Sequence, residues 1–393
     1  MRPDPVAPSS AVRAPRVAVV TTVHRWGDPR VFERETAAWI EQGCEVHVFV
    51  PAAGSLERRG WSTSPRLHLH TWPLPHGRAA RMRLAFGVHR TVAEHGPFDL
   101  VHFHDPELVP AMAWLAARWR RAYFLYDVHE ELPLEVSSKP WIPAGLRPVV
   151  RLGAHALWAW ARVAFEGFAP ATEAIARHWP AARTRIVHNY PRAVFEPPAG
   201  APPAPDGDRV VYVGGLTEVR GIREMVAAVR TVRTRRPALR LELYGALAEA
   251  SLEPVVSEAV REGWCVHTPW LSAEVLAERA RGAGVGLLPY RPAPDHLEAL
   301  PTKMFEYMAM GVPVLASDLP LWRALVHDSG AGRVAEPTAA AFAEALAAML
   351  ADPVALAAHA EHGRTAYRTR YRWEVERERL HWHLERARER MGT

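Results

Sequence analysis

Residues 295–318, DHLEALPTKMFEYMAMGVPVLASD, run from a polar loop through a helix and a glycine into an apolar strand. Pro301 stands where the helix is expected to begin and Gly311 where it is expected to end, positions that proline and glycine favour. The first N–H groups of such a helix are free to bind an anion, and Lys303 adds a full positive charge in its first turn. The segment therefore predicts an α/β sheet with an anion site at a helix N-terminus.

Apolar strands alternate with helices on both sides of this segment, which is typical of parallel sheets covered by helices. In the second half of the chain, strands are expected at residues 209–213, 240–244, 266–269, 285–289 and 312–317, with helices at 222–233, 273–281 and 303–310. In the first half, strands are expected at residues 16–23, 45–50, 67–71, 99–103 and 123–127, with helices at 31–42, 77–95 and 107–119. The sequence thus predicts two doubly wound α/β domains, in which ligands bind beyond the carboxyl ends of the strands.

Composition along the chain indicates where these domains begin and end. Residues 1–15 are rich in Pro and Ala and are expected to be a disordered tail, and residues 16–190 are expected to form the first domain. Residues 191–208 are again rich in Pro and Ala, have no periodicity, and are expected to be the linker. The second domain is expected to span residues 209–371, and a charged helix to occupy residues 372–393.

The overall composition excludes several classes of protein. The chain has 393 residues, of which 49% are hydrophobic and 23% charged, an ordinary globular mixture. Cys44 and Cys265 are its only cysteines, so a disulfide framework is excluded and a reducing compartment is expected. We find no secretory signal and no apolar run long enough to span a membrane, and expect a cytoplasmic location. The net charge of +5 suits an anionic ligand, but without a nucleic-acid-binding motif no nucleic-acid partner is expected.

Two glutamates and a lysine give the segment at 295–318 its chemistry. Glu306 lies one turn after Thr302 and Lys303 on the same helix face, where its carboxylate can accept both hydroxyls of a ribose. Glu298 lies eight positions before Glu306, in the loop. Only two of the 48 Lys and Arg residues are lysines, which hints that the compact charge of Lys303 matters. With its two glutamates at this spacing, the segment resembles the nucleotide-binding signature of the family 4 retaining glycosyltransferases, which adopt the GT-B fold.

This resemblance implies both an architecture and a reaction. The architecture is two Rossmann-like domains facing a central cleft, with the last helix, 372–393, packing back on the first domain. The reaction is transfer of a sugar from a nucleotide diphosphate donor to an acceptor hydroxyl with retention of configuration, without a metal or other cofactor. By carry-over from the family, Glu298 positions the sugar hydroxyls. The leaving phosphate takes the acceptor proton, so that no dedicated base is needed.

A glycine-rich loop follows the first strand of the second domain. Its sequence, VGGLTEVRG at residues 213–221, lets the backbone approach a diphosphate closely. The family usually has an arginine directly after the first glycine, Gly214, and a lysine before the last. Here Gly215 occupies the first basic position and Arg220 the second, so one expected phosphate ligand is absent. We expect Arg220 and Lys303 together to carry the charge of the diphosphate.

Histidines follow two strands of the first domain. In YDVHE, His129 resembles the family histidine that lies beside the donor sugar, and Asp127 would orient it. In VHFHDPE, His104 is expected on the acceptor side. Local backbone contacts for His129 and loop packing for His104 remain alternatives. His102 and His104 indicate a metal only weakly, because the spacing shows no third ligand, and none is expected.

The loop after the first strand contains GDPR, where the family usually has paired glycines. Gly27 is the only glycine of this loop, and loops of this DPRV type occur in a branch of the family. In the family this loop meets both the acceptor and the donor phosphate. Arg30 is therefore expected to contact an anion, with a surface salt bridge as the equal alternative.

Two other functions remain open at this point. A non-catalytic GT-B partner subunit is suggested by the missing arginine at Gly215, and a GT-B sugar-nucleotide epimerase is not excluded by the motifs. A sugar, a lipid-linked sugar or a small molecule would serve as acceptor. Basic residues alternate with apolar ones in residues 78–86 and 114–121, so peripheral contact with the inner face of the membrane is a further expectation, beside the alternative of solvated helix faces.

Overall fold

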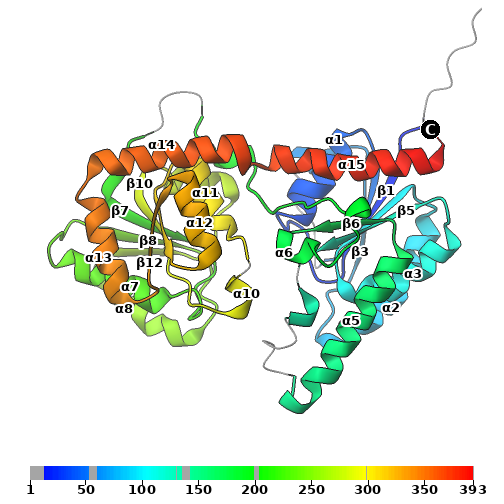
Figure 1. Cartoon of the computed structure of the whole chain (residues 1–393), viewed down its shortest axis with the longest axis horizontal. Coiled ribbons are helices and arrows are strands. Elements are labelled where there is room, and N and C mark those ends of the chain that lie inside the picture. The colour runs from blue at the N-terminus through cyan, green and yellow to red at the C-terminus, as the bar shows by residue number, and fades with distance from the viewer. Residues whose placement is uncertain are drawn as a thin grey trace, which may run out of the picture. The chain divides into compact units, whose positions relative to one another are not determined.

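The computed structural model describes residues 13–52, 60–129, 131–134, 142–198, 203–297 and 299–392, and it divides into two compact units (Figure 1). Unit 1 comprises the chain up to His188 together with the segment from Glu376 onward, and unit 2 comprises Asn189–Val375. Each unit is built around one parallel sheet of six strands, which confirms the predicted α/β class.

The sheet of unit 1 has the strand order β3-β2-β1-β4-β5-β6, and all its strands are parallel. Its strands are β1 Arg16–Val20, β2 Glu45–Pro51, β3 Leu67–Trp72, β4 Leu100–Phe103, β5 Tyr123–Val128 and β6 Gly167–Pro170. The central strands are buried along nearly their whole length, because helices cover both faces.

Helices α2, α3 and α5 cover one face of this sheet, and α1 and α15 cover the other (Figure 1). The helices of unit 1 are η1 Val31–Thr36, α1 Ala37–Glu41, α2 Arg78–His95, α3 Val109–Arg118, α5 Arg147–Ala164, α6 Glu173–Ala176 and α15 Trp373–Met391, with short turns of 3-10 helix at Gly60–Thr63, Pro106–Leu108, Ala144–Leu146 and Ala181–Arg183. The helix expected at 31–42 thus begins with a π-helical segment. The strand expected at 16–23 ends at Val20, because the next two threonines turn to bind Asp105.

The sheet of unit 2 has the order β12-β11-β10-β7-β8-β9 and is also parallel. Its strands are β7 Asp206–Val213, β8 Arg240–Tyr244, β9 Cys265–Thr268, β10 Ala283–Leu288, β11 Val314–Ser317 and β12 Gly332–Ala335. Its helices are α7 Ile222–Arg233, α8 Glu253–Arg261, α9 Ala273–Ala280, α10 Pro294–Leu297, α11 Thr302–Met310, α12 Pro320–Ser329, α13 Ala339–Leu350 and α14 Pro353–Arg370, with 3-10 turns at Ala193–Phe195 and Ala250–Leu252.

Helix α11 is fixed to the centre of the unit 2 sheet by one tyrosine. The Tyr307 hydroxyl accepts a hydrogen bond of 3.0 Å from the backbone N–H of Val213, the last residue of β7. The ring lies on β10, where a Cβ at Gly286 would be only 2.5 Å from it. Gly311 ends the helix as expected, with a φ of 69°, and Met304, Phe305 and Met308 are buried. These contacts place the N-terminus of α11 beside the loop that follows β7.

The last helix belongs to unit 1 over most of its length. Leu380, Leu384 and Ala387 of α15 are buried, and Glu376 accepts a hydrogen bond of 2.8 Å from the backbone N–H of His188. Among the helices that the structure describes, no single one is both long and apolar enough to cross a membrane. Two consecutive helical segments, Ala339–Leu350 and Pro353–Met391, are long and apolar enough when taken together, but the chain bends by 98° at the break between them.

Candidate functional site

The loop after β7 brings together two positive charges that lie far apart in sequence. Gly214 has a φ of 129°, which side-chain-bearing residues rarely adopt. A Cβ at Gly214 would lie 3.0 Å from Cε of Lys303 and 3.5 Å from Nη1 of Arg220. The absence of a side chain therefore lets the loop backbone approach both cations.

Both cations are held by neutral groups. The Arg220 guanidinium donates to the carbonyl oxygen of Gly215 at 3.1 Å and lies 5.8 Å from the centre of the Tyr290 ring. Lys303 Nζ lies 3.4 Å from the hydroxyl of Thr302. In the described part of the chain, neither Arg220 nor Lys303 forms an ion pair with a carboxylate.

Neighbouring arginines differ from these two. Arg223 pairs with Glu218 at 2.7 Å, and Arg291 pairs with Glu224 at 2.6 Å. Arg220 and Lys303, where the glycine loop meets α11, thus carry charge that no described carboxylate neutralises, so this corner of unit 2 is suited to an anion with several negative oxygens.

The start of α11 adds further groups to this corner. Pro301 precedes the helix and no described side chain caps its N-terminus, so its first N–H groups remain available to a ligand. Glu306 is half-buried one turn after Thr302, as the motif predicts. Glu298 lies outside the described residues. The structure therefore brings together Gly214, Gly215, Arg220, Thr302 and Lys303, and their roles as donor ligands remain predictions.

The second group of predicted residues lies in unit 1, where β1, β4 and β5 are neighbours and end at the same edge. Asp127 of β5 is fully buried. Arg30 binds it through Nη2 at 2.7 Å and Nε at 3.1 Å, and donates from Nη1 to the carbonyl oxygen of Val187 at 2.9 Å. The Arg30 side chain is thus directed into the protein, where it holds Asp127.

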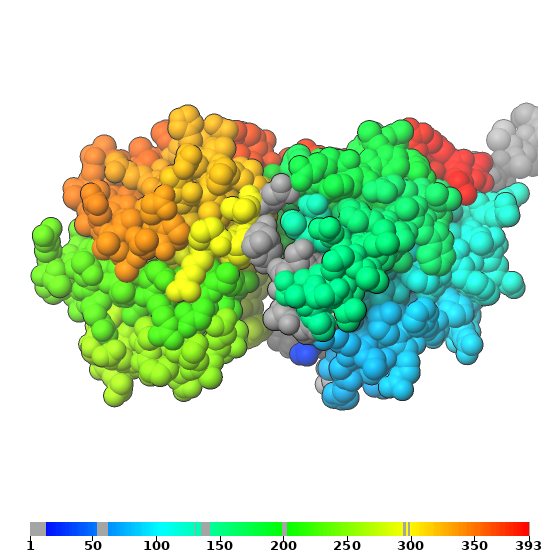
Figure 2. Space-filling model, turned by 60° about the horizontal axis from the view of Figure 1, so that its bottom comes forward, coloured from blue at the N-terminus to red at the C-terminus, as the bar shows by residue number. Residues whose placement is uncertain are grey.

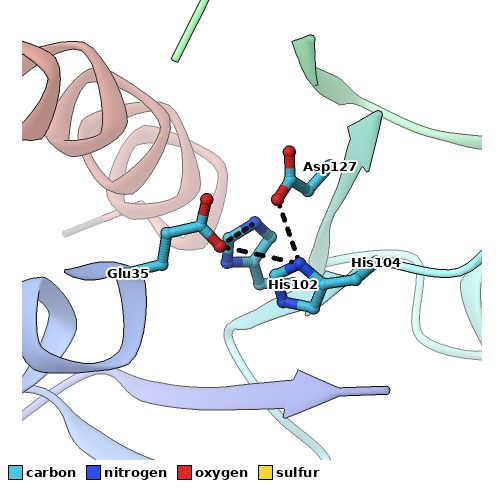
Figure 3. A group of neighbouring side chains, drawn as sticks. All are labelled: Glu35, His102, His104 and Asp127. Carbon is cyan, nitrogen blue, oxygen red and sulfur yellow. Dashed lines mark hydrogen bonds and ion pairs between the residues drawn. The ribbon is translucent and has the colours of Figure 1, made fainter. Parts of the chain in front are cut away.

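Glu35 and two histidines complete this buried network (Figure 3). Glu35, from η1, lies 3.1 Å from Nε of Arg30. His104 Nδ1 lies 3.0 Å from Oδ2 of Asp127 and 3.5 Å from Oε2 of Glu35, and His102 Nε2 lies 3.9 Å from the same Glu35 oxygen. Sequence reasoning missed Glu35. A carboxylate on the apolar face of the helix predicted at 31–42 is the signal that would have indicated it.

The donor set of this cluster resembles a metal site, since one atom from each of Glu35, His102, His104 and Asp127 lies within 4.8 Å of the others. Two observations oppose a metal there. The indole N–H of Trp39 donates to Nδ1 of His102 at 3.3 Å, so the proton of the neutral imidazole is on Nε2, the nitrogen that faces the cluster. Arg30 also already supplies positive charge to both carboxylates. The residues therefore fit an ion-pair network better than a cation site.

Burial and neighbouring charges shift the pKa values of Asp127 and Glu35 in opposite directions. Burial alone would raise the pKa of Asp127, but the charge of Arg30 and the adjacent histidines hold it well below its usual range. Burial and the charge of Asp127 raise the pKa of Glu35 well above its usual range, with only Arg30 opposing. Burial also lowers the pKa of His129. These shifts keep Asp127 charged and His129 neutral at neutral pH, and they favour the neutral form of Glu35.

His129 and His24 form the part of this group that reaches solvent, with side chains 18% and 24% exposed. His129 Nε2 lies 3.2 Å from Oδ2 of Asp127, and the two histidine rings lie 5.3 Å apart. His24 was not predicted. Burial lowers its pKa, but the hydrogen bond with Asp28, at 3.2 Å, and nearby carboxylates raise it overall. The turn depends on Gly27, which has a φ of 91°.

Comparison with known proteins connects both units to one family. The family model of glycosyl transferases group 1 matches residues 207–352, and the model of the glycosyl transferase 4-like domain matches residues 27–190. The phosphatidyl-myo-inositol mannosyltransferase of Mycobacterium tuberculosis is 26% identical over 324 residues, which cover 77% of this chain and 79% of the relative.

Solved structures show the same fold. The sucrose-phosphate synthase of Thermosynechococcus elongatus superposes with a TM-score of 0.71 at 19% identity, over 95% of this chain and 99% of that chain. HepE of Anabaena, in complex with UDP, superposes with a TM-score of 0.67 at 14% identity, over 94% and 99% of the two chains. The chain therefore belongs to the glycosyltransferase group 1 family and is a glycosyltransferase of the GT-B fold.

Proposed function

We propose that this glycosyltransferase takes its sugar from a nucleotide diphosphate donor and transfers it to an acceptor hydroxyl with retention of anomeric configuration. The observation that carries the proposal is the pair Arg220 and Lys303, which lie against Gly214 without a carboxylate partner in the described chain. Their charges match a diphosphate better than a neutral sugar. HepE, which has the same fold, was crystallised with UDP and with UDP-glucose, which supports a donor of this class.

The unit 2 groups have distinct tasks in this proposal. Arg220, Lys303 and the first N–H groups of α11 bind the diphosphate and stabilise the negative charge that develops as it leaves. Glu306 accepts hydrogen bonds from the ribose hydroxyls, and Thr302, one turn earlier on the same helix face, also binds the donor. Fixed positive charge of this kind needs no metal, so we propose that the reaction is metal-independent.

The bond changes follow from retention. The acceptor oxygen forms its bond to the anomeric carbon on the face from which the phosphate oxygen departs, and the acceptor proton passes to that departing oxygen. Glu298, by resemblance to the family, positions the sugar hydroxyls. His129, neutral and next to Asp127, is suited to hydrogen-bond the sugar.

The acceptor is proposed to be a polyol, either free or carried on a lipid. The name of the Mycobacterium tuberculosis relative gives phosphatidyl-myo-inositol as its acceptor, which makes inositol-containing lipids the first acceptors to examine. A cytoplasmic location is proposed as well, and it is supported by the two buried cysteines, which are both free.

Release of nucleoside diphosphate from UDP- and GDP-sugars, with phosphatidylinositol and free inositol as acceptors, tests the proposal. The wild type should release diphosphate in an acceptor-dependent manner. Lys303→Ala and Arg220→Ala should each lower kcat/KM at least ten-fold, since each loses about 1.4 kcal/mol or more of transition-state stabilisation. Arg223→Ala is the matched control, because Arg223 lies beside the same loop but is paired with Glu218.

Two results would count against the proposal. Equal activity of Lys303→Ala and wild type would show that the diphosphate binds elsewhere. Binding of nucleoside diphosphate without turnover of any donor would instead favour the non-catalytic subunit that the missing arginine at Gly215 suggests.

A further inference from the structure

Helix α5 has a row of apolar side chains directed at solvent. The exposed fraction is 67% for Val149, 71% for Leu152, 46% for Trp160 and 86% for Val163. The opposite side of the helix is buried against unit 1 through Ala154, Trp158 and Ala161. Residues 149, 152, 156, 160 and 163 recur at the spacing that puts them on one helical face, so the outward face of α5 is apolar along most of the helix.

Two neighbouring helices extend this apolar surface. Phe86 of α2 is 56% exposed and Trp114 of α3 is 50% exposed. Helix α3 contacts both α2 and α5, so the three helices form one layer on the same face of the sheet. Figure 2 shows α5 in green and α2 in blue on the same side of unit 1. We call this surface the α2–α3–α5 face.

Most of the charged side chains around this apolar surface are positive, and Glu94 of α2 is the one carboxylate on the three helices. Residues 142–165, which include the whole of α5, contain no Asp or Glu. Arg151 is exposed beside the apolar row. Exposed arginines on or next to the other two helices are Arg83, Arg90, Arg118, Arg120 and Arg121. Glu107, at the base of α3, is paired with Arg81 at 2.8 Å and is largely buried.

Together these observations indicate which partner binds the α2–α3–α5 face. A second copy of this chain would place mostly arginine against arginine, because α5 has no carboxylate and Glu94 is the only one on the other two helices. Lipid phosphates supply the missing negative charge over a broad area, and the acyl region accepts Leu152, Trp160 and Val163. We infer that the α2–α3–α5 face docks on the surface of an anionic lipid bilayer, with the apolar row of α5 inserted at the level of the headgroups.

Docking of this kind has a consequence for the site in unit 1. Helix α5 begins at the edge where β5 ends, so Val149 and Leu152 lie towards the same edge of the sheet as His129. Contact with the bilayer would therefore bring lipid headgroups to the edge of unit 1 that carries the buried network. The inference does not rest on the proposed donor or acceptor, because lipid binding requires neither.

Flotation of the full chain with vesicles tests the inference. Vesicles of 30% phosphatidylglycerol in phosphatidylcholine should bind the wild type, and pure phosphatidylcholine vesicles should bind it at least ten-fold more weakly. Raising NaCl to about 0.5 M should weaken binding several-fold, because salt screens the arginine–phosphate attraction. Arg151→Ala should weaken it by roughly five-fold.

Two double variants separate the α5 face from exposed apolar residues in general. Leu152→Ser with Val163→Ser should lower vesicle affinity at least ten-fold. Val354→Ser with Trp270→Ser, which changes side chains 81% and 78% exposed in unit 2, should leave it unchanged. All four positions are on the surface, so melting temperatures and nucleoside diphosphate binding should match the wild type in both variants.

Several results would overturn the inference. Failure of the wild type to float, equal flotation with neutral vesicles, or normal flotation of Leu152→Ser with Val163→Ser would each do so. A dimer of the wild type in sedimentation that this variant lacks, without lipid binding, would assign the face to a second copy of the chain.

Discussion

At the scale of single residues, Arg30 has the largest predicted effect on folding. Its guanidinium binds both oxygens of fully buried Asp127 and also faces Glu35. Arg30→Met would leave the buried Asp127 carboxylate without its arginine partner, and removing one partner of a buried ion pair typically costs about 3–5 kcal/mol. Urea unfolding should show this loss in the wild-type background and a smaller loss when Asp127→Asn is already present. Equal losses in the two backgrounds would mean that the pair does not contribute as a unit.

We expect the free energy of unfolding to depend on pH through the titration of Glu35. Its pKa lies near 4.5 in the unfolded chain and well above that in the fold. Its contribution is therefore complete below pH 4.5 and is lost as pH rises through the folded value, at up to about 1.4 kcal/mol per pH unit. Glu35→Gln lacks this titration, so its stability relative to the wild type should increase between pH 5 and pH 9. Parallel curves over that range would contradict the assigned protonation state.

The sequence predicted the site at the glycine loop of unit 2 better than the buried ion-pair network of unit 1. Gly214, Arg220 and Lys303 meet as expected, because each belongs to a local motif with a fixed place at a strand end or helix start. Arg30 was expected to face either an anion or solvent, and its ion pair is instead inside the protein. Its partner Asp127 lies on β5, 97 residues further along the chain, and sequence spacing contains no information on such pairing.

At the scale of elements, the apolar runs in the sequence predicted the central strands of both sheets. The two strands that were not predicted, β6 and β12, lie at sheet edges. β6 has the sequence GFAP and β12 the sequence GRVA, and each has one strand as its neighbour in the sheet. On its other side β6 accepts backbone hydrogen bonds from Arg185 and Val187. Short strands at the edge of a sheet need no continuous apolar pattern, and turn-forming residues such as Gly and Pro are tolerated there. The helical pattern of α11 was clear because Gly311 ends it and its buried residues recur at helical spacing.

The end of α11 is expected to be sensitive to one added methyl group. Gly311→Ala forces an alanine into a φ of 69° and places its Cβ 2.1 Å from Nη1 of Arg364. Gly263→Ala is the matched control in the same unit, because Gly263 has a φ of 79° and no heavy atom within 4 Å of the added Cβ. Both variants should lose roughly 1 kcal/mol from backbone strain, and Gly311→Ala should lose more. Equal losses of unfolding free energy would mean that Arg364 moves aside freely.

At the scale of the whole molecule, the two units have separate hydrophobic cores. We therefore expect two calorimetric unfolding transitions. A nucleoside diphosphate at about 100 times its Kd should stabilise unit 2 by roughly 2.7 kcal/mol and leave the transition of unit 1 less affected. A single transition that shifts as a whole would show that the units unfold together.

The most direct test of the central claim is isothermal titration of the wild type with UDP, GDP, ADP and dTDP. We predict that one of them binds with a stoichiometry of one, that Lys303→Ala and Arg220→Ala each raise its Kd at least ten-fold, and that Arg223→Ala does not. Binding of none of the four, or undiminished binding by Lys303→Ala, would contradict a diphosphate site at the glycine loop and α11.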